Sequence, residues 1–81
     1  MPTYQTKNYK TKDLAEASML IVKNQKMLSL QREGRVCWFI FSNEEECERL
    51  SHEYYYGEVL VDALKYSETM KRLKNRIFAE E

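Results

Sequence analysis

The chain is poor in the residues on which phosphate and metal sites depend. It has two glycines, Gly34 and Gly57, so no glycine-rich loop is available to bind a phosphate group. Its strongest metal ligands are Cys37, Cys47 and His52, which form neither a Cys-x-x-Cys nor a His-x-x-x-His pair. Cys47 and His52 lie about 140° apart round a helix, so their side chains diverge. We therefore expect neither a metal ion nor another cofactor.

Residues suited to catalysis are also scarce or poorly placed. Cys37 lies in an apolar stretch, where a thiol is expected to be buried and inert. The pair His52-Glu53 resembles the start of a zinc-protease motif, but Tyr56 occupies the position of the second histidine. The glutamates of residues 44–48 suit the solvated first turns of a helix better than paired acid–base chemistry. The sequence therefore predicts a protein that has no catalytic residues and is not an enzyme.

Long apolar runs are missing as well. The longest, residues 36–41, has the length of a strand and is far too short to span a membrane. Met1 is followed by polar residues and not by an apolar targeting segment. Without such a segment, two cysteines are most simply reduced core residues. We expect residues 1–81 to form a single cytoplasmic domain with no membrane partner.

The charges balance overall but are unevenly distributed. The chain has 13 basic and 13 acidic residues, which argues against a globally basic nucleic-acid-binding protein. Residues 1–40 contain seven Lys and Arg against three acidic residues, whereas residues 41–58 contain six glutamates and Arg49. This asymmetry indicates a dipolar surface, although a run of charges is usually a solvated helix face.

Periodicity predicts an α+β domain in which a small antiparallel sheet packs against three helices. A short polar edge strand within residues 4–11 is followed by a helix from about 14 to 23, capped by Asp13 with Glu16 in a capping box. Two apolar strands then form a hairpin, and Ser42 is expected to cap a second helix that ends at Gly57. Asp62 is expected to cap a third helix that ends near residue 78. The predicted order is therefore β-α-β-β-α-α.

The first helix carries a wide apolar arc, which predicts that it lies at the centre of the fold. Its central stripe has a helical period and consists of Leu14, Ala17, Ser18 and Ile21. The remaining side of this helix, which is expected to face solvent, consists of Glu16, Met19 and Lys23.

The hairpin has apolar residues on both faces. With Glu33 and Gly34 as the loop, one face is uniformly apolar and is expected to meet the first helix; it contains Leu28, Leu30, Cys37, Phe39 and Phe41. The other face contains Met27, Ser29, Gln31, Val36, Trp38 and Ile40. Two alternatives remain open for this second face: the third helix covers it, or another molecule does.

Protein interaction is the favoured function, because the chain has more large apolar side chains than a small monomer easily buries. Three consecutive tyrosines span about 200° of the second helix, so they cannot share one environment. Trp, Tyr and Met are enriched at interface centres. The candidate interface residues are Met27, Val36, Trp38, Ile40, Tyr55 and Tyr56. Self-association is the simplest such interface, and another protein is the alternative partner.

Nucleic-acid binding is the second hypothesis. The candidate phosphate contacts are basic residues of the third helix, namely Lys71, Arg72, Lys74 and Arg76. Lysines also line the first strand, and Tyr4, Tyr9 and Trp38 would stack on bases if that strand lay beside the hairpin. A solvated basic face is the simpler explanation of the same residues.

Four short segments resemble a family of small uncharacterised proteins from bacteria, archaea and phages, known only as a domain of unknown function. The segments are residues 9–14 (YKTKDL), 35–41 (RVCWFIF), 56–62 (YGEVLVD) and 71–78 (KRLKNRIF). The resemblance implies a stand-alone cytosolic protein, with a mobile element as one source, and brings no catalytic residues. A phage origin would suggest an accessory role such as binding a host protein.

Overall fold

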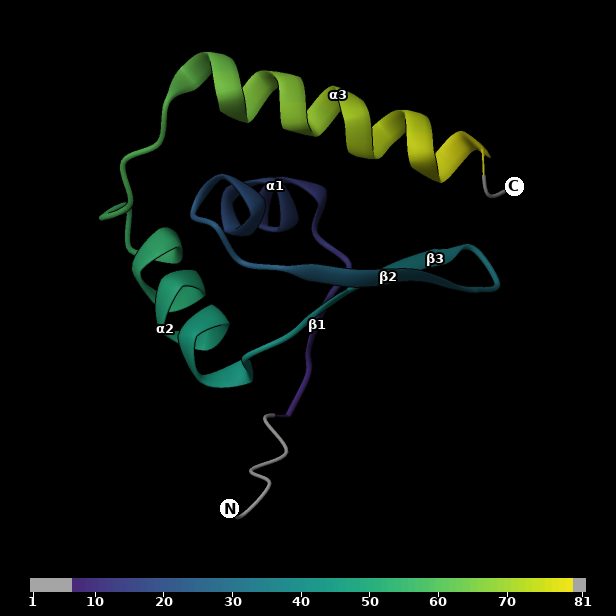
Figure 1. The fold of residues 1–81 in the computed structure, drawn as a ribbon, viewed down its shortest axis with the longest axis horizontal. Helices are drawn as coiled ribbons and strands as arrows, with labels where there is room; N and C mark the ends of the chain where they lie inside the picture. The colour runs from purple at the N-terminus through teal and green to yellow at the C-terminus, as the bar shows by residue number, and fades with distance from the viewer. Residues whose placement is uncertain (1–6, 80–81) are drawn as a thin grey trace.

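The computed structural model describes residues 7–79 and contains six secondary-structure elements (Figure 1). They are β1 (Tyr9–Thr11), α1 (Leu14–Val22), β2 (Met27–Glu33), β3 (Val36–Phe41), α2 (Glu44–Tyr55) and α3 (Ala63–Ala79). The predicted α+β class and the order β-α-β-β-α-α are confirmed.

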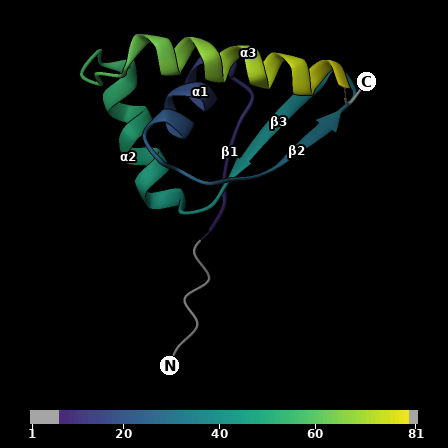
Figure 2. The ribbon, with the colours of Figure 1, turned by 45° about the horizontal axis from the view of Figure 1, so that its top comes forward.

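The three strands form one antiparallel sheet in the order β1-β3-β2 (Figure 2). The apolar strand β3 is therefore central, as its composition predicts. The first strand does lie at an edge beside the hairpin, but it begins at Tyr9. The part of that prediction that falls on Tyr4 lies outside the described residues.

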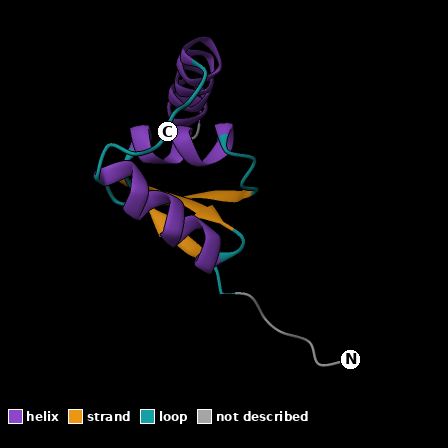
Figure 3. Cartoon of the chain, turned by 90° about the vertical axis from the view of Figure 1, so that its left-hand side faces the viewer, coloured by secondary structure: helices purple, strands orange, loops and turns teal. Residues whose placement is uncertain are grey.

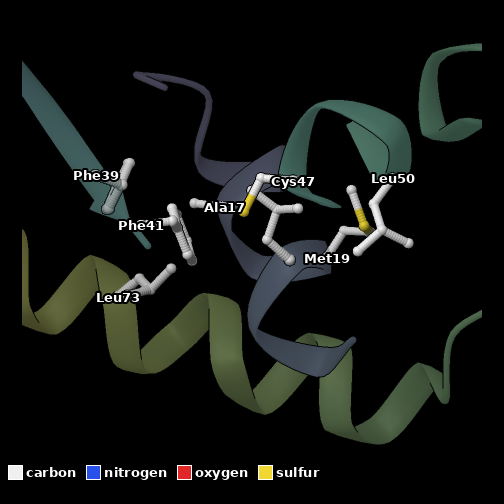
Figure 4. Close-up of a cluster of buried hydrophobic side chains, with 8 residues drawn as sticks. Ala17, Met19, Phe39, Phe41, Cys47, Leu50 and Leu73 are labelled. Carbon is white, nitrogen blue, oxygen red and sulfur yellow. The ribbon is translucent and has the colours of Figure 1, made fainter. Parts of the chain in front are cut away.

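The helices α1 and α3 are stacked on one side of the sheet, with α1 between α3 and the strands (Figures 1 and 3). The helix α2 packs beside α1 and β1. The core lies among these elements, and Figure 4 labels Ala17, Met19, Phe39, Phe41, Cys47, Leu50 and Leu73 among its residues. The prediction that the first helix is central is confirmed, because Ala17, Met19 and Leu20 are fully buried.

Two of the three predicted helix starts are confirmed. The Asp13 carboxylate accepts hydrogen bonds from the backbone N–H groups of Ala15 and Glu16, and the Asp62 carboxylate accepts one from Lys65. The prediction for α2 is wrong, because the cap is Asn43, whose Oδ1 accepts from the N–H of Glu46 at 3.3 Å. Asn43 has a φ of +63°, a left-handed conformation that asparagine tolerates better than serine.

The predicted capping box and the predicted solvent-facing side of the first helix are also wrong. The Asp13 N–H donates to Thr11 Oγ1, while the Glu16 side chain turns inward and is only 3% exposed. Met19, on the same face, is fully buried. The reason is that β1 and α2 pack against this side of α1 and supply polar partners for Glu16.

The hairpin register differs from the predicted one by two residues. Glu33 pairs with Val36, so the loop consists of Gly34 and Arg35, with Gly34 at a φ of +62°. An irregularity in β2 between Met27 and Ser29 then moves Met27 into register with Phe41. Met27 therefore packs against the core, whereas Leu28 is 46% exposed. The predicted faces of these two residues are reversed.

Candidate interaction surface: the outer face of the sheet

The third helix does not cover the second face of the hairpin. Its inward stripe packs on α1 and on the core, with Leu73 buried in the core. Tyr66 donates its hydroxyl to the Ala15 carbonyl oxygen at 3.4 Å, and Arg32 donates to the Ile77 carbonyl oxygen at 3.3 Å. In Figure 3, α3 lies beyond α1 when viewed from the strands. Of the two alternatives, coverage by the third helix is therefore excluded.

We call the face of the sheet that points away from α1 the outer face. The registers alternate the side chains, so that Tyr9, Thr11, Leu30, Phe39 and Phe41 point to the core. The residues of the outer face are Lys10, Ser29, Gln31, Glu33, Val36, Trp38 and Ile40. This surface thus draws on all three strands.

Trp38 lies at the centre of the outer face and is held there by a charged residue on each side. Its indole Nε1 donates to Glu33 Oε1 at 2.9 Å, and Lys10 Nζ lies 5.3 Å from the ring centroid. Lys10 belongs to β1, Trp38 to β3 and Glu33 to β2. Because Lys10 pairs with Ile40 and Glu33 with Val36, the three residues form a diagonal row across the sheet. The row holds the ring in a defined position.

The apolar part of the outer face comes from β3 alone. Ile40 is 5% exposed and lies between Lys10 and Ser29 in the register, while Val36 and Trp38 are half-buried. Lys10, Gln31 and Glu33 on the flanking strands are exposed. The surface therefore has an apolar centre and a polar rim.

The remaining candidate interface residues lie elsewhere. Tyr55 and Tyr56 lie at the end of α2 and are 63% and 70% exposed. The Tyr55 hydroxyl donates to Glu16 Oε1 at 3.1 Å, and the Tyr56 ring packs on His52 with their centroids 4.7 Å apart. Met27 packs against the core, as described above. The structure therefore brings together Val36, Trp38 and Ile40 and separates them from the other three.

The candidate nucleic-acid contacts lie on another side of the molecule. Lys71, Arg72, Lys74 and Arg76 are all exposed on α3, which lies on the same side of the sheet as α1 and not on the outer face. Tyr9 points to the core and donates its hydroxyl to Glu16, so it is not available for stacking on a base. Tyr4 lies outside the described residues.

A buried carboxylate, Glu16, is the feature that the sequence pattern did not reveal. It accepts hydrogen bonds from Tyr9 at 2.5 Å, from Thr11 at 2.7 Å, and from Ser51 and Tyr55. Burial and the bond to Glu16 raise the pKa of Tyr9 to about 12. The cluster ties β1, α1 and α2 together. The available signal was the pair of hydroxyls at positions 9 and 11, which point to the same face of a strand and need a polar partner there.

A shallow hollow of about 500 Å³ lies along α2. Its lining is mainly acidic: Glu44, Glu45, Glu48, Arg49, His52 and Glu53. Arg49 forms ion pairs with Glu46 at 2.5 Å and Glu53 at 2.8 Å, which are ordinary exposed pairs one turn apart on a helix. Within residues 7–79, no group of three or more His, Cys, Asp and Glu residues is arranged to hold a metal ion.

No helix in the described part of the chain is long and apolar enough to cross a membrane. The sequence matches no protein-family model, and neither the curated proteins nor the solved structures compared with it provide a match. The resemblance to a family of uncharacterised proteins therefore stays a prediction.

Proposed function

We propose that this protein is a non-catalytic protein-interaction module that binds its partner through the outer face of the sheet. The observation that carries the proposal is the position of α3. This helix packs on α1, and no helix of residues 7–79 covers the face of the sheet on which the register places Trp38. A strand with one solvated face normally alternates apolar and polar residues, whereas β3 is apolar on both faces.

The anatomy of the outer face supports this proposal. Protein interfaces have apolar centres in which Trp is enriched, surrounded by a polar rim that stays partly hydrated. Here Trp38 and Val36 occupy the centre, and Lys10, Gln31 and Glu33 form the rim. Because the contacts of Trp38 with Lys10 and Glu33 already restrict its ring, little side-chain entropy remains to be lost on binding.

Site-specific photocrosslinking tests the proposal. A photoreactive amino acid replaces Gln31 on the outer face or, as a matched control, Asn75 on the exposed side of α3. We expect covalent protein adducts from position 31 in cells and much weaker adducts from position 75. Equal labelling from both positions, or none from position 31, would contradict the proposal.

Nucleic-acid binding by α3 is the second candidate, because its four basic residues are exposed and none is in an ion pair within residues 7–79. If they contact phosphates, affinity for mixed oligonucleotides will fall steeply with salt. The double variant Lys71→Glu with Arg72→Glu would then abolish binding, whereas Lys10→Glu on the outer face would leave it nearly unchanged. Failure of the wild type to bind at low salt would exclude this candidate.

A further inference from the structure

We propose that the partner on the outer face is a second copy of this chain, related to the first by a two-fold axis that passes beside Trp38. In this arrangement Lys10 pairs with the partner's Glu33, and Glu33 pairs with the partner's Lys10. The inference rests on the proposed function, since it names the occupant of the same surface.

The order of charges across the sheet is the basis of this inference. The row runs from Lys10 on one edge strand, through Trp38 on the central strand, to Glu33 on the other edge strand. It therefore has a positive end, an aromatic centre and a negative end. The strand order gives this sequence of charges, and the two contacts with Trp38 hold it in place.

A two-fold axis makes this row complementary to itself. When the axis lies in the plane of contact and perpendicular to the row, rotation exchanges the two ends and returns the centre to itself. Lys10 then faces a carboxylate, Glu33 faces an ammonium group, and the two tryptophan rings meet. A pair of indole rings in offset or edge contact adds attraction beyond the area that they bury. One symmetry operation thus satisfies every part of the row.

Other occupants fit the row less well. A nucleic-acid backbone would be attracted by Lys10 but repelled by Glu33, which lies within hydrogen-bonding distance of the same indole. A partner with a uniformly charged surface would gain at one end and lose at the other. The alternation of charge therefore favours a surface with the same pattern in reverse.

The size of the face sets the expected strength of the dimer. With about 4.8 Å between neighbouring strands and about 3.3 Å per residue, three strands of six residues would span roughly 14 by 20 Å, and β1, with three residues, covers only half of that length. This is below the roughly 800 Å² per partner of a standard interface. We therefore expect a weak dimer that forms as the concentration rises, rather than a permanent one.

Charge reversal tests the pairing directly. Lys10→Glu makes both ends of the row acidic and Glu33→Lys makes both ends basic, so each variant alone should dimerise less than the wild type. When the two variants are mixed, the acidic ends of one chain face the basic ends of the other at both contacts. The heterodimer should therefore be favoured about tenfold over either homodimer.

Sedimentation velocity over a concentration series measures these equilibria. As a control, Lys65→Glu on α3 mixed with Glu33→Lys should show no such preference for the heterodimer. An equal preference in the control mixture would overturn the pairing of Lys10 with the partner's Glu33.

A second measurement needs no substitution. A carbodiimide joins amines to carboxylates only when they are in contact, and mixing ¹⁴N- and ¹⁵N-labelled wild-type chains separates bonds between copies from bonds within one copy. We expect a mixed-isotope peptide that joins Lys10 to Glu33. Its absence at a concentration where dimers are present would overturn the pairing.

The two proposals fail in different ways. A wild type that stays monomeric throughout, or charge-reversed variants that do not associate when mixed, would overturn the second copy as partner. In that case, photocrosslinks from position 31 to a larger protein would still support the outer face as a binding surface. Absence of any adduct from position 31 would overturn both.

Discussion

Replacement of Glu16 by alanine tests whether the hydrogen bonds of this buried side chain hold β1, α1 and α2 together. The variant removes the shared acceptor of four hydroxyl groups, on Tyr9, Thr11, Ser51 and Tyr55. Thr11 and Ser51 are buried, at 6% and 4% exposed, so water does not readily replace the lost partner. A buried group that loses its hydrogen bond destabilises a protein by about 1–3 kcal/mol. We expect Glu16→Ala to lower the free energy of unfolding by about 3–4 kcal/mol, since the exposed Tyr55 contributes little.

That loss is large for a domain of this size. Proteins have about 0.05–0.15 kcal/mol of stability per residue, which gives roughly 4–12 kcal/mol for 81 residues. Urea unfolding followed by circular dichroism measures the change. Glu16→Gln, which keeps an acceptor oxygen and the shape of the side chain, should cost about half as much.

The matched control is Glu68→Ala, an exposed glutamate within α3, which should change stability by less than about 0.5 kcal/mol. If Glu16→Ala cost no more than Glu68→Ala, the hydrogen bonds of Glu16 would not stabilise the fold. Glu16 would then be dispensable to the packing of β1, α1 and α2.

Three further predictions follow from particular contacts. Folding raises the pKa of Tyr9 from 10.0 to about 12, so the neutral Tyr9 side chain stabilises the folded state fully below pH 10. This stabilisation is lost as the pH rises towards 12, and Tyr9→Phe should therefore flatten the decline of the free energy of unfolding between pH 10 and 12. Because Met27 packs on the core and Leu28 does not, Met27→Ala should lower the free energy of unfolding by about 2 kcal/mol and Leu28→Ala by less than about 0.5 kcal/mol. A larger loss for Leu28→Ala than for Met27→Ala in urea unfolding would show that the irregularity in β2 is misplaced. Asn43→Ala should cost about 1–2 kcal/mol because it removes a cap at a left-handed position, whereas equal effects of Asn43→Ala and Ser42→Ala in the same assay would restore Ser42 as the cap.

Much of the fold was predictable because its elements have clear periodicity and end signals. The helical spacing of Ala63, Tyr66, Met70, Leu73 and Ile77 predicts a packed stripe on α3; Tyr66, Leu73 and Ile77 do pack at the core, whereas Ala63 is exposed. Gly57 stands where a left-handed residue ends α2. The central strand was predictable from its continuous apolar composition.

The errors arose where a local pattern depends on a distant partner. Glu16 has the spacing of a capping-box residue, but hydroxyls from β1 and α2 make its burial favourable. The irregularity in β2 exchanges the faces of Met27 and Leu28, and alternation alone gives no sign of it.

The candidate site was only partly predictable for the same reason. The sequence placed Val36, Trp38 and Ile40 on one face, and the structure agrees. It did not indicate which element would cover them, because an apolar stripe on a helix does not specify the surface against which it packs. It also gave no sign that Lys10 and Glu33 would lie on either side of Trp38, since that requires the strand order.

The solution mass of Trp38→Ala, measured beside the wild type over a concentration series, tests whether the outer face of the sheet is a self-association surface. The outer face as a self-association surface predicts that the wild type shifts from monomer to dimer, while the folded variant remains a monomer at every concentration. A wild type that never exceeds monomer mass, or a variant that dimerises as well as the wild type, would contradict the claim. Loss of the variant's fold, which corresponds to about 3–5 kcal/mol, would also contradict it, because Trp38 would then be a core residue.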